Sequence, residues 1–158
     1  MTLAITKRFE KQNPPPLPLP DVNQLPAMSD NVIPSMLVYF GIINLDSCKL
    51  PKLQSTFPKV DASLLLKPAA IGAKAMQPED LREGPLLDAQ EAFVLRAAGV
   101  VACERMAAIA RDLDKDAPND WVIKIRPSQL DMWLWSVAKD RPDYRVLPRF
   151  AERNTVFY

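Results

Sequence analysis

The densest cluster of chemistry-bearing side chains is the stretch QLDMWLWSVAKD, residues 129–140. It places one carboxylate, Asp131, beside two indoles, Trp133 and Trp135. At helical spacing Asp131 and Trp135 lie one turn apart, on a face shared with Ala138. An indole that displaces water from a carboxylate raises its pKa and strengthens its interaction with a cation that forms nearby. The spacing therefore indicates a candidate catalytic acid.

The same spacing also has a structural interpretation. Ser128 follows Pro127 and is expected to be the N-cap of a helix, with Asp131 at the third helical position of a capping box. Acids are common in first turns because they complement the helix dipole. Spacing alone leaves both roles of Asp131 open. The neighbouring face carries an apolar stripe that we expect to be buried, consisting of Leu130, Trp133, Leu134 and Val137.

Composition limits both the size of the fold and its partners. The chain has 158 residues, of which 48% are hydrophobic and 25% charged, enough for one modest core plus a tail. Twenty basic and 19 acidic residues leave a net charge of +1, so no basic surface is expected to recruit duplex nucleic acid. A nucleotide-sized ligand is compatible with this balance.

The chain has no histidine, which excludes Ser-His and Cys-His nucleophile pairs and the commonest zinc ligand. Acid–base chemistry therefore falls to Asp and Glu, and we expect neither a metal nor a cofactor. Cys48 and Cys103 lie far apart, as is typical of structural thiols in a reducing compartment. No apolar run approaches the ~20 residues that span a bilayer. These features predict a soluble, cytoplasmic protein without a membrane partner.

The chain divides into a tail and a helical domain. Residues 1–28 contain PPPLPLP, which forbids helix and predicts an extended tail or linker, either a spacer or a ligand for an SH3-like groove. Residues 29–158 form the domain. Its first stretch, DNVIPSMLVYFGII, predicts a short helix closed by Asn44, with a strand as the competing interpretation. Residues 46–85 carry repeated prolines and predict an irregular insertion with short helical turns.

The clearest helix signal covers residues 88–113. Asp88 and Glu91 form a capping-box signature. Glu104 lies off the centre of the helix's apolar stripe, either solvated or as a buried acid that positions a ligand. The stripe is small enough for close approach of another helix and consists of Leu95, Ala98, Gly99, Ala102, Met106 and Ile109. DKDAPND then ends the helix, WVIKI leads into the Asp131 helix, and the apolar last residues predict a docked C-terminus.

Three separated stretches also share their order and spacing with one known family. The first runs from Asp30 to Gly41 and matches the family's Asp-Tyr-Arg-apolar-Pro-Gln-x-Leu motif and following glycine at Asp30, Pro34, Leu37 and Gly41. The second places Arg96 and Glu104 about two turns apart on an Ala-rich helix. The third is the most specific, because Leu130-Asp131-Met132-Trp133-Leu134-Trp135 is similar to Leu-Asp-aromatic-aromatic-Leu-Trp. With a Thr-Val-Phe-Tyr ending, the domain resembles the C-terminal half of the queuosine salvage family, the queuosine 5′-phosphate N-glycosylases.

The resemblance implies an all-α fold akin to the helix-hairpin-helix DNA glycosylases. It also implies hydrolysis of the bond between ribose C1′ and a deazaguanine base in a nucleotide substrate, which releases queuine for tRNA modification. Asp131 and Asp30 would be the catalytic acids, and which of them faces the sugar cation stays open. The residues that would contact substrate are Trp135, Trp133, Arg96 and Glu104. Carboxylates suit this chemistry, because they stabilise an oxocarbenium-like state and activate water without histidine.

The chain departs from the family pattern at three places. Asn31-Val32 replaces Tyr-Arg, and Ala151-Glu152-Arg153-Asn154 replaces His-Arg-x-Arg. If those basic residues bind phosphate, the nearby substitutes are Arg145, Arg149 and Arg153. Family members also have an N-terminal half, for which this chain offers the proline-rich tail. A missing half or a second chain is therefore an expected partner, and the alternative function is a non-catalytic remnant that binds a nucleoside or a partner.

Overall fold

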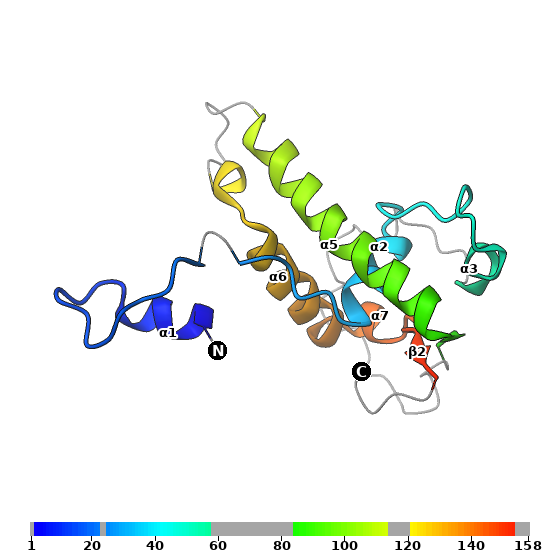
Figure 1. Cartoon of the computed structure of the whole chain (residues 1–158), viewed down its shortest axis with the longest axis horizontal. Helices are drawn as coiled ribbons and strands as arrows, with labels where there is room; N and C mark the ends of the chain where they lie inside the picture. Colours follow the sequence, from blue (N-terminus) through cyan, green and yellow to red (C-terminus); the bar gives the residue numbers. More distant parts are fainter. Residues whose placement is uncertain (1, 23–24, 58–83, 114–120, 154–158) are drawn as a thin grey trace.

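The computed structural model of the chain describes residues 2–22, 25–57, 84–113 and 121–153. Within these ranges the chain is mostly helical, as the sequence predicts (Figure 1). The helices are α1 (Thr2–Phe9), α2 (Val32–Tyr39), α3 (Pro51–Thr56), α5 (Ala89–Arg111), α6 (Pro127–Asp140), α7 (Pro142–Arg145) and the 3-10 helix η3 (Val122–Lys124). The strands β1 (Leu86–Leu87) and β2 (Ala151–Glu152) pair in parallel. None of the helices in these ranges has the length and apolar character to cross a membrane.

Helix α2 is the innermost element of the fold. Its side chains Ile33, Met36 and Leu37 are fully buried, and so is Ser35 among them. A helix that is apolar on all sides needs neighbours on all sides. Helices α5 and α6 pack against it and against each other, and the three together enclose the central core (Figure 1).

The two ends of α2 are set by local backbone chemistry. At the start, Oδ1 of Asp30 accepts the N–H groups of Val32 at 2.7 Å and Ile33 at 3.2 Å, which satisfies donors that lack a helical partner. At the end, Gly41 adopts a φ of 71°, the left-handed conformation that closes a helix. The prediction of a helix here is confirmed, but the prediction that Asn44 closes it is wrong, because Gly41 ends it sooner.

Helix α5 begins as the sequence predicts. The carboxylate of Asp88 accepts the N–H of Glu91 at 2.9 Å, and the carboxylate of Glu91 accepts the N–H of Asp88 at 2.9 Å, so the capping box is confirmed. Its small buried residues let α2 and α6 approach closely. At Gly99 a Cβ atom would lie 2.4 Å from the hydroxyl oxygen of Ser29 and 3.5 Å from Cβ of Pro34.

Helix α6 begins two residues earlier than predicted, because Arg126 and not Ser128 is its N-cap. Pro127 occupies its first position, where proline is favoured because its missing N–H has no helical partner there. The side-chain oxygen of Gln129 accepts the N–H of Arg126 at 2.9 Å and so caps the helix start. The prediction that Ser128 is the N-cap is therefore wrong, and its hydroxyl is left without a capping role.

One face of α2 holds the segment that leads into β2. Asn31, Ser35 and Tyr39 lie one turn apart on this face. The Asn31 amide donates to the carbonyl of Phe150 at 2.9 Å, the Ser35 hydroxyl accepts the N–H of Phe150 at 3.3 Å, and the Tyr39 hydroxyl donates to the carbonyl of Pro148 at 2.6 Å. Burial raises the pKa of Tyr39, which keeps this hydroxyl protonated as a donor. Phe150 is fully buried as a result.

The tail is only partly separate from the domain. Helix α1 is set apart from the other helices, and the proline stretch at 14–20 forms neither helix nor strand (Figure 1). Ala27, however, is buried in the central core. Three parts of the predicted organisation lie outside the described residues, namely residues 58–83 of the insertion, the helix break at 114–120 and the last residues, 154–158.

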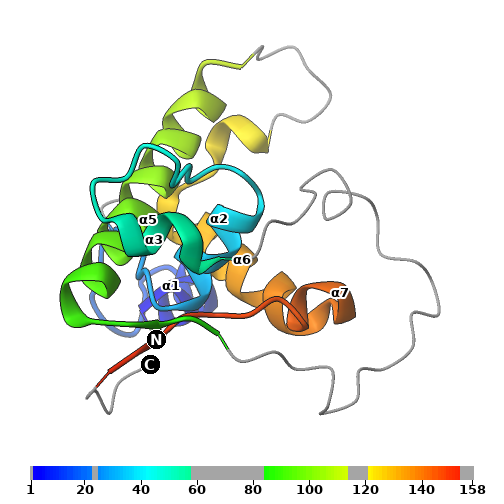
Figure 2. The same ribbon diagram turned by 90° about the vertical axis from the view of Figure 1, so that its right-hand side faces the viewer.

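The strands β1 and β2 lie at the N-terminal end of α5, where distant parts of the chain meet (Figure 2). The backbone approach just before β1 is very close. A Cβ atom on Gly84 would lie 1.5 Å from the carbonyl oxygen of Arg149 and 2.4 Å from its carbonyl carbon. Real Cβ atoms do not approach backbone so closely, so only glycine fits at this position.

Replacing Gly84 with alanine is expected to lower the free energy of unfolding by about 3 kcal/mol, because the backbone at Arg149 has to move away. The matched control is Gly41→Ala, which meets no atom but is strained by its positive φ and should cost about 1 kcal/mol. Urea unfolding of both variants measures the difference. Equal losses in the two variants would contradict the close approach at Gly84.

Candidate functional site

Asp131 is a buried carboxylate that joins two distant parts of the chain. It lies on the inner side of α6 and is 9% exposed. Its Oδ2 atom accepts the backbone N–H of Met28 at 2.6 Å. Because charged acceptors make short, strong hydrogen bonds, this contact holds the segment before α2 against α6. Asp131 is therefore not a first-turn capping residue but a fixed buried acid.

The surroundings of Asp131 raise the pKa of its carboxyl group above the ordinary value. Burial is the largest cause that raises the pKa of its carboxyl group, and the negative charge of Asp30 raises it further. The hydrogen bond from Met28 opposes both effects, because it stabilises the carboxylate, but the net direction is upward. A carboxyl group with a raised pKa can exchange protons closer to neutral pH than an ordinary aspartate.

Asp30 lies close enough to affect Asp131 electrostatically, so the structure brings the two predicted acids together. Asp30 is half-buried, and its Oδ1 is held by the two N–H groups at the start of α2. The capping role fixes its position relative to the helix. These hydrogen bonds thus orient the Asp30 carboxylate, whose negative charge raises the pKa of Asp131.

Other polar groups gather around this pair of acids. Arg149 is half-buried, and the charge of Asp30 partly offsets the lowering of its pKa by burial. Its Nη2 donates to the carbonyl of Ala138 at 2.7 Å, whereas its buried Nε has no hydrogen-bond partner among the described residues. Cys103 is fully buried on α5, and burial together with the charges of Asp131 and Glu104 raises its pKa to about 11. The thiol therefore stays protonated, as expected of a structural cysteine.

Two buried hydroxyls, those of Ser29 and Ser128, lack hydrogen-bond partners within the described residues. Ser29 follows Met28 and faces α5 at Gly99. Ser128 is 4% exposed and lies one turn before Asp131 on α6. The sequence predicted only a capping role for Ser128. That its hydroxyl is buried without a hydrogen-bond partner, one turn from Asp131, is apparent only in the folded chain.

Both tryptophans lie largely at the surface, whereas Asp131 is buried. Trp133 is 54% exposed and Trp135 is 42% exposed. The ammonium group of Lys139 lies 3.4 Å from the centre of the Trp135 ring, which is a cation–π contact at the surface. The prediction that Trp133 belongs to the buried stripe is wrong, because α2 and α5 cover the side of α6 that carries Leu130, Asp131 and Leu134.

The two remaining predicted residues, both on α5, have different surroundings. The guanidinium of Arg96 pairs with the carboxylate of Glu152 at 2.5 Å and lies 5.5 Å from the centre of the Phe150 ring, so it holds β2 against α5. Glu104 is exposed, in agreement with the solvated interpretation. In the described part of the chain, no group of three His, Cys, Asp or Glu residues could hold a metal ion.

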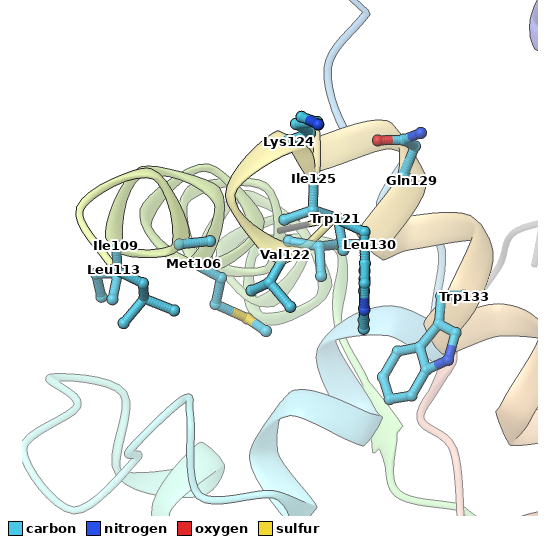
Figure 3. Close-up of a pocket in the computed structure, with 11 residues that line it drawn as sticks. Met106, Ile109, Leu113, Trp121, Val122, Lys124, Ile125, Gln129, Leu130 and Trp133 are labelled. Atoms are coloured by element: carbon cyan, nitrogen blue, oxygen red, sulfur yellow. The ribbon is translucent and has the colours of Figure 1, made fainter. Parts of the chain in front are cut away.

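A separate apolar groove lies between the C-terminal half of α5, η3 and the start of α6. Its volume is about 760 Å³. Figure 3 shows the α5 side chains on one side, Trp133 on the other and the η3 side chains between them. Neither Asp30, Asp131 nor Trp135 lines it. The lining residues are Met106, Ile109, Ala110, Leu113, Trp121, Val122, Lys124, Ile125, Gln129, Leu130 and Trp133.

Sequence reasoning missed this groove, because it placed Met106 and Ile109 in a buried stripe. Ile109 is in fact 63% exposed, and so is Trp121. Apolar residues at helical spacing indicate a helix face that packs against other elements, but they do not show how many turns of that face are packed. Here α2 covers the N-terminal part of the stripe, and the last turns of α5 continue past it (Figure 1).

The variant Asp131→Asn is expected to flatten the pH dependence of stability. A folded-state pKa above the unfolded value means that the stability contributed at low pH is lost as pH rises through the folded pKa. Asparagine does not titrate, and its side-chain oxygen can still accept the N–H of Met28. The variant should therefore gain stability relative to the wild type as pH rises from about 4 to 7.

Urea unfolding at several pH values measures this effect. The control is Asp143→Asn, because pairing with Arg141 lowers the pKa of Asp143. The stability that Asp143 contributes is present above its unfolded-state pKa and is lost as pH falls through its folded-state pKa. The pH dependence expected from Asp143 is therefore opposite to that expected from Asp131. If the free energy of unfolding changed with pH in the same way in the wild type and in Asp131→Asn, a raised pKa at Asp131 would be ruled out.

Comparison with known proteins found no matching family model, no matching curated protein and no matching solved structure.

Proposed function

We propose that this chain hydrolyses the N-glycosidic bond of queuosine 5′-phosphate and releases queuine for tRNA modification. The observation that carries the proposal is the buried carboxyl group of Asp131, held at 2.6 Å by the N–H of Met28 and influenced by the nearby charge of Asp30. The motif resemblance in the sequence supplies the substrate, and the arrangement of these groups supports the chemistry. A chain without histidine needs carboxyl groups for this reaction.

The two acids have surroundings that suit different tasks. Cleavage of a glycosidic bond builds positive charge on the sugar, and a carboxylate nearby stabilises that charge. Asp30 is half-buried, so its carboxylate is more exposed than that of Asp131. Asp131 lies deeper, and its raised pKa suits a group that takes up a proton from water. In this assignment Asp30 faces the sugar cation and Asp131 is the general base.

Positive charge near Asp30 favours a phosphorylated substrate. Burial is the largest cause that lowers the pKa of Arg149, and the nearby positive charge of Arg145 lowers it further. A bound phosphate would relieve this repulsion between the arginines by neutralising the positive charge. These two arginines thus supply the charge that the departures from the family motif remove elsewhere.

Asp131→Asn and Asp30→Asn are each expected to lower the rate of queuine release from queuosine 5′-monophosphate by about 100-fold or more, because each removes a carboxylate from the reaction. Asparagine is as good a helix cap as aspartate, so Asp30→Asn preserves the start of α2. The readout is free queuine by chromatography. The control is Asp140→Asn, which removes an exposed acid at the end of the same helix and should leave the rate unchanged.

A second candidate function is that of a binding module, and the apolar groove favours it. Monomeric proteins seldom expose large contiguous apolar surface without a use for it. The volume of about 760 Å³ lies within the range of small-molecule sites. In that case the chain binds a ligand or partner at α5, η3 and α6 and releases no queuine.

The groove is expected to bind the apolar dye anilinonaphthalene sulfonate in the folded chain. Ile109→Lys places a charge in the lining and should strongly reduce the bound fluorescence. Val101→Lys is the matched control, because Val101 is also exposed on α5 but does not line the groove. Equal fluorescence of the two variants would show that the dye binds elsewhere.

A further inference from the structure

We infer that the outer face of α5 is an interface between two copies of this chain, which pair through antiparallel α5 helices. The outer face is the side of α5 that points away from α2 and α6. The inference goes beyond the proposed function and does not depend on it. The residues of the outer face that carry the argument are Val94, Ala97, Val101, Glu104, Arg105 and Ala108.

The apolar part of the outer face is open to solvent. Val94 is 37% exposed and Val101 is 47% exposed, and Ala97 between them is also exposed. Helices α2 and α6 pack against the buried residues on the other side of α5 (Figure 2). A helix at the surface normally carries polar residues on the side away from the core. Neighbouring apolar residues on the solvent side are instead typical of an interaction face.

Two charged residues of opposite sign, Glu104 and Arg105, follow the apolar part on the same face. Both are exposed, and neither belongs to an ion pair in the described part of the chain. They are adjacent in the sequence, so their side chains diverge around the helix and do not face each other. Each charge is therefore available to a charge on another molecule.

A twofold axis that passes between Glu104 and Arg105, perpendicular to α5, brings unlike charges together. In this antiparallel pair, Glu104 of each copy faces Arg105 of the other copy, so two ion pairs form across the interface. A parallel pair would instead oppose Glu104 to Glu104 and Arg105 to Arg105, and like charges repel. The charges on this face thus match a second copy of the chain in the antiparallel orientation.

The sizes of the side chains fit the same arrangement. The axis places Val101 of one copy opposite Ala108 of the other, so that a larger side chain meets a smaller one. Small residues let helix axes approach to about 8–10 Å. The two helices overlap over residues 97–112, which is about 24 Å of helix at 1.5 Å per residue.

The extent of this overlap predicts a reversible dimer. A standard interface buries roughly 800 Å² on each partner, and a single pair of helix faces buries less. We therefore expect a Kd on the order of 10–100 μM. Sedimentation velocity of the full chain over a series of concentrations measures this constant.

Charge reversal on the outer face tests the pairing. Glu104→Arg and Arg105→Glu each replace two attractive contacts with two repulsive ones, so each variant should raise the Kd of the dimer about tenfold or more. The double variant Glu104→Arg/Arg105→Glu exchanges the two charges and should restore the Kd of the wild type. Recovery in the double variant is expected only for antiparallel helices.

A mixture of the two single variants provides a second test. In a dimer of Glu104→Arg with Arg105→Glu, every charge again faces an opposite charge, so the mixture should form dimers that neither variant forms alone. The control is Asp140→Arg, which reverses an exposed charge at the end of α6 and should leave the Kd unchanged. Circular dichroism of each variant confirms that it keeps the helical fold.

Three results would overturn the inference. One is a wild-type chain that stays monomeric at concentrations well above the expected Kd. Another is a wild-type dimer whose Kd is unchanged in both single variants, because the interface would then lie elsewhere. The third is a loss of dimer in the single variants without recovery in the double variant, which would contradict the antiparallel pairing of Glu104 with Arg105.

Discussion

The complete enclosure of α2 is the constraint on which the rest of the structure depends. An eight-residue helix with no solvent-facing side is stable only if other elements cover it. Helices α5 and α6 provide most of that cover, and the segment around Phe150 provides the remainder through Asn31, Ser35 and Tyr39. Residues from all parts of the domain therefore meet at one short helix.

The candidate acids are a consequence of that arrangement. The segment before α2 has to cross α6 to reach the core, and the crossing brings the N–H of Met28 to Asp131. The same crossing places Asp30 at the start of α2, where it caps the helix and acts electrostatically on Asp131. Asp30 thus stabilises the start of α2, whereas Asp131 is buried. Because the negative charge of Asp30 raises the pKa of Asp131, the free energy of unfolding depends on the protonation of Asp131.

The acids and the apolar groove use different sides of α6. Asp131 faces the core between α2 and α5, whereas Gln129 and Trp133 border the groove near η3. Leu130 contributes to both, since it is part of the central core and also lines the groove. A ligand in the groove therefore contacts the helix that carries Asp131 without contacting the acid itself.

Local signals in the sequence were sufficient for several elements. The capping box of Asp88 and Glu91 placed the start of α5, and the dense apolar run after Ser29 predicted a buried helix. Such signals work because caps and helical periodicity depend on residues within a turn or two of one another. They also brought attention to Asp30 and Asp131, which the fold places together.

Only the tertiary structure decided what surrounds those residues. Spacing put Asp131 and Trp135 one turn apart, but only the fold shows that α2 and α5 bury the acid while Trp135 lies at the surface against Lys139. Spacing made Ser128 a cap, but Pro127 and Gln129 start the helix and leave that hydroxyl free. The physical reason is that burial depends on which helices pack together, and the partner of Asp131 is a backbone N–H about a hundred residues away in the chain.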